Sequence, residues 1–284
     1  MRLINLDGRL AIESIGLAVD VQRASGGQFS SDVQAVYERW PEFVQWADDL
    51  GDEDAQAFDD ARLGPPVVAP RQIFAIGLNY RGHAVETGLE LPDSPMVFTK
   101  FASSITGPLG QIVMPSDMVD WEAELVVVIG RRAESVSEAQ AWDYVAGLTV
   151  GQDISERALQ IKPPAPQQFN LAKSFPRFAP LGPALVTPDE FDDRDDLEIG
   201  CLIDGEQVQK ARTSDLIFSV PAIVSYLSSI VTLFAGDVIF TGTPAGIGFA
   251  SKPQRFLRHG EELTTYVEGI GTMRHEFVDK DRQC

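Results

Sequence analysis

VDWEAELVVVIG, residues 119–130, opens with acidic side chains and continues as an apolar run that Gly130 ends. Residues 125–129 are apolar and mostly β-branched, which predicts a strand buried on both faces. Because alternate residues of a strand share a face, the side chains of Glu122 and Glu124 point the same way and lie close together. Two like charges at the end of a buried strand repel each other and lose hydration. Either a divalent cation offsets that cost, or both glutamates face water at a solvated strand end.

Outside this strand, short β-branched runs dominate the chain after residue 70. They are QIFAIGLNY (72–80), PMVFTK (95–100), QIVMP (111–115), PALVT (183–187), LEIGCLIDG (197–205), DVIFTG (237–242) and ELTTYVEGIG (262–271). Two helices are predicted between them, one after Ser135 in SVSEAQAWDYVAG and one in SVPAIVSYLSSIV, where Pro221 suits the first turn. Strands outnumber helices and do not alternate with them regularly, which favours an α+β, β-rich fold with a mixed sheet over a doubly wound fold.

The first part of the chain predicts a small lobe of its own. Short β-like runs with turn signals come first, and apolar residues at helical spacing follow from Val33 to Trp40, until Pro41 interrupts them. An acidic stretch that becomes rich in proline and glycine, residues 52–70, is typical of a connector. We therefore expect a small N-terminal α/β lobe over residues 1–65 and a main domain over residues 70–284.

Composition limits the classes of function. The chain has 284 residues, and its net charge of −19 argues against binding to nucleic acid or to an anionic membrane surface. No apolar run approaches membrane-spanning length and no signal-peptide pattern is present, so a cytoplasmic enzyme or binding protein is expected. The two cysteines, Cys201 and Cys284, form no CxxC pattern that would indicate a zinc site or a disulfide framework.

The segment GLNYRGHAVETG, residues 77–88, holds one of only three histidines in the chain. Glu86 follows His83 by three residues, so the two side chains share a face if the segment is helical. A carboxylate beside an imidazole orients the ring and raises its basicity, which is the arrangement of a general base. Histidine–glutamate pairs without a function are also common on helix surfaces, and the residues alone leave both interpretations open.

A second polar group follows a predicted strand end in VGQDISERALQIK, residues 150–162. If a helix starts here, Asp153, Arg157 and Gln160 lie on one of its faces, since they are spaced at i, i+4 and i+7. An acid, a cation and an amide on one face could hold a metal ion and a bound carboxylate together. The alternative is an aspartate that caps the helix, with an exposed arginine.

Two lysines and one threonine complete the candidate set. Lys173 lies among aromatic residues and prolines, and Lys100 follows the run PMVFT. Each could contact a substrate or donate a proton, or could simply extend its ammonium group to water along an apolar surface. Thr243 lies in the glycine-rich turn of GDVIFTGTPAGIG, whose backbone amides could bind an anion or could merely form a tight turn.

Glu122, Glu124 and Asp153 share one chemical property, because all three offer hard oxygen ligands. Three carboxylates without a nearby cysteine or histidine favour Mg²⁺ or Mn²⁺ over Zn²⁺. Three protein ligands also leave positions open for water and substrate, which is typical of a catalytic metal site.

Six motifs in this order make the chain similar to the fumarylacetoacetate hydrolase family: GLNYRGHAVE, DWEAELVVVIG, GQDISERALQ, LAKSFPRFAPLGP, RTSDLIFSVPAIVSYLS and GDVIFTGTPAGIG. The resemblance runs from about residue 73 to residue 277. It implies a mixed β-sandwich roll, a homodimer and one Mg²⁺ or Mn²⁺ in each active site. On the matching positions, Glu122, Glu124 and Asp153 resemble metal ligands, His83 and Glu86 a water-activating dyad, and Lys173 a lysine near the metal. Lys100, Arg157, Gln160 and Thr243 resemble substrate contacts.

The resemblance implies a metal-dependent hydrolase that cleaves a carbon–carbon bond in a small β-diketo acid. Acylpyruvates, fumarylpyruvate and fumarylacetoacetate are the substrate types expected. The same residues also suit a decarboxylase or an enol–keto isomerase acting on oxaloacetate-like or 2-hydroxy-diene-dioate acids, and these alternatives stay open. A third class, a non-catalytic metal-dependent carboxylate-binding protein, would have no use for a histidine–glutamate dyad.

Overall fold

The structure of the chain is a computed structural model that describes residues 1–51, 54–88, 90–162 and 167–280. Its largest sheet has 12 strands in the order β4-β3-β2-β1-β14-β12-β11-β17-β6-β7, with β5 paired to β1 and β8 paired to β14. These strands are β1 Arg2–Leu6, β2 Arg9–Ser14, β3 Leu17–Asp20, β4 Gln56–Ala57, β5 Leu63–Gly64, β6 Ile73–Gly77, β7 Met96–Thr99, β8 Ile105–Thr106, β11 Ala123–Ile129, β12 Val145–Gln152, β14 Ala179–Val186 and β17 Val238–Phe240.

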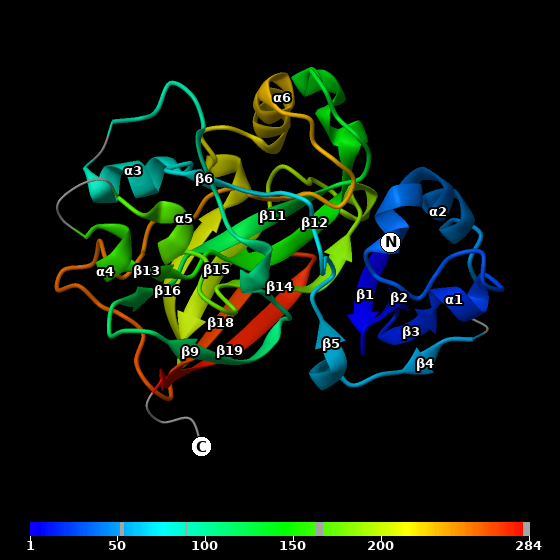
Figure 1. Cartoon of the computed structure of the whole chain (residues 1–284), viewed down its shortest axis with the longest axis horizontal. Helices are drawn as coiled ribbons and strands as arrows, with labels where there is room; N and C mark the ends of the chain where they lie inside the picture. The colour runs from blue at the N-terminus through cyan, green and yellow to red at the C-terminus, as the bar shows by residue number, and fades with distance from the viewer. Residues whose placement is uncertain (52–53, 89, 163–166, 281–284) are drawn as a thin grey trace.

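A second sheet of five strands packs against the centre of the first (Figure 1), in the order β16-β15-β18-β19-β9. Its strands are β9 Leu109–Met114, β15 Glu198–Ile203, β16 Glu206–Arg212, β18 Glu262–Val267 and β19 Gly271–Asp279. A short pair, β10 Val119–Asp120 and β13 Ser155–Glu156, completes the strands. The pairing is mixed, since β17–β6 and β19–β9 are parallel and most other pairs are antiparallel. The predicted β-rich, mixed sandwich architecture is therefore confirmed.

The helices are short. The α-helices are α1 Val21–Ala24, α2 Trp40–Ala47, α3 Arg81–Thr87, α4 Arg157–Gln160, α5 Phe169–Ala172 and α6 Val220–Ile230, and the 3₁₀ helices are η1 Ala35–Arg39, η2 Asp60–Arg62, η3 Ala102–Ser104, η4 Glu138–Tyr144, η5 Pro188–Glu190 and η6 Thr213–Asp215. In Figure 1, α3, α4 and α5 lie on the side of the molecule opposite the N-terminal strands. No helix in the described ranges is long and apolar enough to span a membrane.

The strand β11 is buried on both faces, as its apolar run predicts. Leu125, Val127 and Ile129 belong to the hydrophobic core between the two sheets. Val126 and Val128 belong to a second core on the opposite face, which the aromatic residues of the N-terminal helices help to fill. Because Glu124 lies two residues before Val126, its carboxylate is on the second face, at the end of β11 where that apolar core stops.

The N-terminal strands extend the main sheet. Arg2 and Leu3 of β1 pair with Val186 and Leu185 of β14, so backbone hydrogen bonds run from β1 into the central strands. Pro41 lies in the first turn of α2 and separates it from η1. Whether residues 1–65 fold as a separate lobe stays a prediction, and Cys284 lies outside the described residues.

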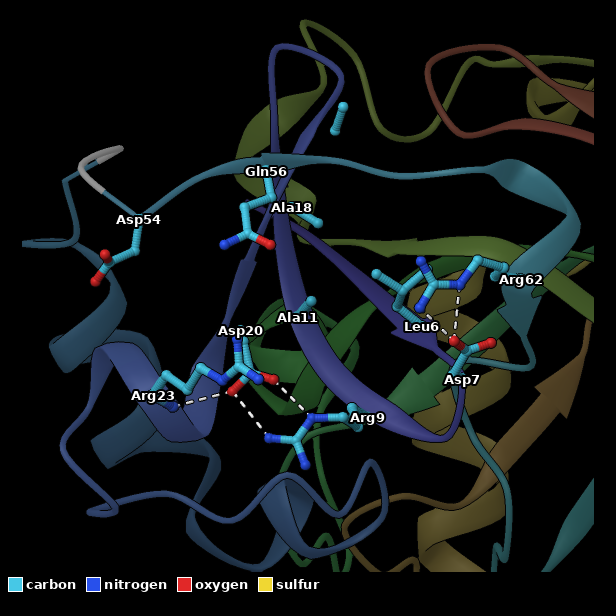
Figure 2. Close-up of a pocket in the computed structure, with 11 residues that line it drawn as sticks. Leu6, Asp7, Arg9, Ala11, Ala18, Asp20, Arg23, Asp54, Gln56 and Arg62 are labelled. Atoms are coloured by element: carbon cyan, nitrogen blue, oxygen red, sulfur yellow. Dashed lines mark hydrogen bonds and ion pairs between the residues drawn. The ribbon is translucent and has the colours of Figure 1, made fainter.

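A groove of about 390 Å³ lies on the exposed face of these N-terminal strands, where the segment around β4 crosses them (Figure 2). Its charged groups largely neutralise one another. The guanidinium of Arg9 donates to Asp20 over 2.7 Å, and Arg62 pairs with Asp7. None of the residues predicted to carry chemistry lines this groove.

Of the two helices predicted in the main domain, one is an α-helix. Ser219 caps α6 by accepting from the backbone amide of Ala222, and Pro221 lies in the first turn as expected. The helix predicted after Ser135 is present as the 3₁₀ helix η4. The Ser137 hydroxyl bonds the Gln140 side chain and gives no cap to the backbone, and the chain returns to extended geometry at Val145.

His275 on β19 predicts a loss of stability in acid. Its Nε2 bonds the carbonyl of Gly107 over 3.0 Å, its Nδ1 has no partner among the described residues, and burial lowers its pKa to about 4. The pKa of this histidine is therefore higher in the unfolded state, about 6.5, than in the folded state, and below pH 6.5 the unfolded state binds more protons. Stability should fall as the pH drops from 7, by about 2 kcal/mol at pH 5 from this group.

Urea unfolding at pH 7 and at pH 5 measures that effect. His275→Gln keeps a donor for the Gly107 carbonyl and removes the titration, so its stability should change less between the two pH values than that of the unmodified chain. An equal change in both proteins would contradict the assignment.

Candidate active site

Three buried carboxylates lie together where β11 and β12 end. Glu122 precedes β11, Glu124 lies within it, and Asp153 follows β12, which pairs with β11 through Ala123 and Gln152. One ligand oxygen from each side chain lies within 4.8 Å of the others. Glu122 is 7% exposed, Glu124 1% and Asp153 0%. The solvated strand end considered from the sequence is therefore excluded, because these carboxylates do not face water.

Two buried ammonium groups neutralise part of this charge. The Nζ of Lys173 donates to Glu122 Oε2 over 2.7 Å and to Asp153 Oδ2 over 2.5 Å. The Nζ of Lys100 donates to the other oxygen of Asp153 over 2.5 Å and to the backbone carbonyl of Lys173. Both lysines are thus held inside the site, and neither extends its ammonium group to water.

A buried arginine holds the remaining glutamate oxygen. The guanidinium of Arg157 donates to Glu122 Oε1 over 2.7 Å, to Asp120 Oδ2 over 2.8 Å and to Gln160 Oε1 over 2.8 Å. Asp120 is completely buried and also accepts from the backbone amides of Gly248 and Phe249. This network links the start of β11 to the turn that follows β17.

The carboxylates differ in how well they are compensated. Burial opposes ionisation of Glu122, but the charges of Lys173 and Arg157 outweigh it and lower the pKa of Glu122 to about 2. Burial, with repulsion from Asp153 and Glu122, raises the pKa of Glu124 well above its usual value. Glu124 accepts the backbone amide of Gly242 over 2.6 Å and forms no ion pair with a described residue.

This donor set fits a hard divalent cation. When all of them are ionised, Asp120, Glu122, Glu124 and Asp153 face three buried cations, Lys100, Arg157 and Lys173, so one negative charge is left over. Carboxylate oxygens without nearby thiolates are the ligands that Mg²⁺ and Mn²⁺ prefer. A dication held by Glu122, Glu124 and Asp153 would remove the repulsion at Glu124 and leave one positive charge, which suits an anionic ligand.

The predicted histidine–glutamate pair forms on α3. Nδ1 of His83 lies 2.7 Å from Oε1 of Glu86, and His83 is 9% exposed. The other oxygen of Glu86 accepts the backbone amide of Gly246 over 2.9 Å. The dyad is therefore fixed to the same turn as Glu124.

The structure corrects the local geometry predicted around Asp153. This residue does not share a helix face with Arg157, because β13 intervenes and α4 begins only at Arg157, capped by Glu156. The amide of Asp153 bonds the carbonyl of Glu122, and β13 pairs with β10, so the backbone stays extended. Arg157 reaches the site through Glu122 and Asp120 instead.

The substrate contacts predicted from the resemblance fall into two groups. Arg157 and Gln160 lie side by side next to Glu122. Lys100 is bonded to Asp153 and to backbone, and Thr243 accepts from the side chain of Gln209 over 2.8 Å. These assignments stay predictions.

Sequence reasoning missed Asp120 and Gln209. Asp120 was detectable, since it precedes Glu122 and Glu124 at the same two-residue spacing on an extended segment. Gln209 had no such signal, because it lies on β16, more than 80 residues from the carboxylate strand that it contacts. The glycine-rich turn was predicted as a possible anion site, and its amides in fact bind carboxylates of the protein itself.

Known proteins match this architecture and sequence. The family profile described as "Fumarylacetoacetate (FAA) hydrolase C-terminal" matches residues 72–278. Oxaloacetate tautomerase Fahd2a, mitochondrial, from Rattus norvegicus is 40% identical over 215 residues, which is 75% of this chain and 68% of the rat protein.

Two solved structures extend the likeness to the whole chain. A putative HpcE protein from Mycobacterium smegmatis is 51% identical with a TM-score of 0.93, covering 99% of this chain and 100% of that one. Maleylpyruvate hydrolase from Sphingobium sp. SYK-6, in complex with manganese (II) ion and pyruvate, is 25% identical with a TM-score of 0.81, covering 98% and 99%.

Proposed function

Because the chain belongs to the fumarylacetoacetate hydrolase family, we propose that it is a Mg²⁺- or Mn²⁺-dependent enzyme that forms an enolate from a small keto acid. The observation that carries this proposal is the buried cluster of Glu122, Glu124 and Asp153, with Lys173 bonded to two of its members. The maleylpyruvate hydrolase that was solved in complex with manganese (II) ion and pyruvate supports the same class of cofactor and ligand.

A bound dication would supply Lewis-acid stabilisation of the negative charge that develops on an enolate oxygen. The chain's own groups supply the remaining chemistry. The ammonium of Lys173 lies between two carboxylates and would face the developing oxyanion. Arg157 and Gln160 would orient a substrate carboxylate, and Lys100 and Thr243 are proposed to complete its contacts. The site's excess of one positive charge with the metal bound favours anionic acids over neutral diketones.

The histidine–glutamate dyad supplies proton transfer. Glu86 fixes the ring of His83 through Nδ1, so the second ring nitrogen is left for the substrate side. As a general base, His83 could take a proton from the carbon next to a carbonyl, or from a water molecule that attacks a carbonyl. The first step leads to enol–keto isomerisation, and the second leads to hydrolysis of a carbon–carbon bond.

Enol–keto isomerisation of an oxaloacetate-like acid is the reaction we place first, because the rat relative at 40% identity is named an oxaloacetate tautomerase. Hydrolysis of an acylpyruvate or a fumarylpyruvate-type acid is the second candidate. The dyad, fixed to the same turn as Glu124, favours it, as does the maleylpyruvate hydrolase among the structural relatives. Decarboxylation of oxaloacetate needs no base, and the experiment must distinguish it from both isomerisation and hydrolysis.

The test is a turnover screen of the purified chain with Mn²⁺ or Mg²⁺. Enol-oxaloacetate, oxaloacetate, an acylpyruvate and fumarylpyruvate are supplied in parallel, and the loss of enol absorbance is followed together with product acids. Metal-dependent conversion of enol-oxaloacetate supports isomerisation, and release of pyruvate from the diketo acids supports hydrolysis. No turnover of any of them with metal present would contradict the proposal.

We also propose that the enzyme is a homodimer. Exposed apolar side chains gather near the edge strand β7, where Met96 is 44% exposed, Phe101 50% and Leu171 on α5 52%.

Light scattering should give about twice the 31.0 kDa of one chain. Phe101→Glu should shift the mass toward that of one chain, because it places a charge within the apolar surface. Ile230→Glu on α6 is the control, since Ile230 is 65% exposed but lies elsewhere. A monomer in the unmodified protein would overturn this proposal.

A further inference from the structure

The turn after β17, residues 241–249, presents its backbone amides to carboxylates on three different elements. Gly242 donates to Glu124 on β11 over 2.6 Å, and Gly246 donates to Glu86 on α3 over 2.9 Å. Gly248 donates to Asp120, the partner of Arg157, over 2.8 Å. One short segment thus contacts a candidate metal ligand, the histidine–glutamate dyad and Asp120, the carboxylate that holds Arg157.

The turn has no helix or strand of its own over residues 241–249, so its position must come from other contacts. Two of its residues are held by Gln209 of β16. The Nε2 of Gln209 donates to Thr243 Oγ1 and to the carbonyl of Pro244, both over 2.8 Å. The Oε1 of Gln209 accepts the backbone amide of Ala123, between Glu122 and Glu124, over 2.9 Å.

Every polar atom of this side chain is used in a buried setting. Gln209 is 1% exposed, and its amide group supplies two donors to the turn and one acceptor to β11. Only a side chain with both donors and an acceptor at this length satisfies all of these partners. The turn also packs closely against the backbone of β16, because a Cβ on Gly246 would lie 2.1 Å from the carbonyl of Val208, next to Gln209.

From these contacts we propose that Gln209 is a positioning residue that sets the metal site and the dyad together, by fixing the turn 241–249 to the strand that carries Glu122 and Glu124. The inference rests on the proposed function only in taking those carboxylates as the metal ligands. Gln209 touches neither the metal position nor the dyad itself. It acts through Ala123 on one side, and through the amides of Gly242 and Gly246 on the other.

The test compares Gln209→Met with Gln207→Met. Methionine has nearly the length of glutamine and cannot hold the turn or the Ala123 amide. Gln207 lies on the same strand, and its Nε2 donates to the carbonyls of Cys201 and Gln209, so its replacement removes hydrogen bonds but none of those that hold the turn. Mn²⁺ affinity is measured by titration calorimetry, and hydrogen exchange is measured in α3, residues 81–87.

Gln209→Met should weaken Mn²⁺ binding by about 10–100-fold, the range found when groups that support metal ligands are lost. It should also speed exchange in α3, since Glu86 loses a fixed partner at Gly246. Gln207→Met should leave both readouts as in the unmodified chain, even if its melting temperature falls. Equal Mn²⁺ affinity in Gln209→Met and the unmodified chain, or an equal loss in both variants, would overturn the proposal.

If Gln209→Met does not fold, Gln209→Asn tests the same positioning role. Asparagine keeps the amide group but shortens its reach, so the turn and Ala123 cannot both be bonded. Weaker Mn²⁺ binding in this variant supports positioning, and unchanged binding contradicts it. If the unmodified chain itself bound no Mn²⁺, the metal proposal would fail first, which keeps the two failures distinguishable.

Discussion

Glu124→Gln should abolish tight Mn²⁺ binding and lower turnover by more than about 100-fold, because loss of a ligand should cost more than loss of a group that supports one. Glutamine keeps the shape of the side chain and an oxygen for the Gly242 amide, which lies 2.6 Å from the carboxylate. The substitution therefore removes the charge and little else. Titration calorimetry and steady-state turnover measure the two effects.

The same substitution should have the opposite effect on the metal-free protein. Glu124 is buried next to Glu122 and Asp153 and has no ion pair with a described residue, so its charge opposes folding when no cation is present. Metal-free Glu124→Gln should melt at a higher temperature than the metal-free unmodified chain. Saturating Mn²⁺ should raise the melting temperature only of the unmodified chain, with about 2.7 kcal/mol of stabilisation at a hundredfold excess over Kd.

Glu134→Gln is the control for charge alone, since Glu134 is an exposed carboxylate that pairs with Arg132. It should leave Mn²⁺ affinity and turnover unchanged. Retention of full activity by Glu124→Gln, or full activity of the unmodified chain in excess chelator, would remove the metal-ligand assignment.

His83→Ala should separate reactions that need a base from one that does not. General-base catalysis typically contributes 10²–10⁴-fold, so isomerisation and carbon–carbon hydrolysis should fall by about that factor. Decarboxylation of oxaloacetate requires no base and should survive largely unchanged. Mn²⁺ affinity should also be retained, because His83 belongs to the dyad on α3 and is not one of the three clustered carboxylates.

Glu86→Gln gives the graded comparison. Glutamine can still bond the His83 ring through its oxygen but no longer supplies a charge, so its activity should lie between those of His83→Ala and the unmodified chain. If all three reactions fell in parallel in His83→Ala, the histidine would be serving substrate binding, and the base assignment would be wrong. If only decarboxylation were detectable in the unmodified chain, both proposed reactions would be replaced by it.

The sequence by itself predicted the carboxylate pair because strand geometry is local. Alternation along residues 122–129 determines that Glu122 and Glu124 share a face, whatever the rest of the chain does. The spacing of His83 and Glu86 on one helical turn is local in the same way, and the two side chains are 2.7 Å apart. The ordered motifs likewise identified the family and its β-rich fold without any coordinates.

Only the tertiary structure decided how these local pieces are held together. Asp153 joins the glutamates because β12 pairs with β11, and a spacing argument placed it wrongly on a helix face with Arg157. The contacts of Lys100 and Gln209 cross 53 and 86 residues of chain. No periodicity in the sequence encodes such contacts. They depend on which buried donors and acceptors the packed sheets leave facing one another, and each of those groups must find its partner because burial has removed water as the alternative.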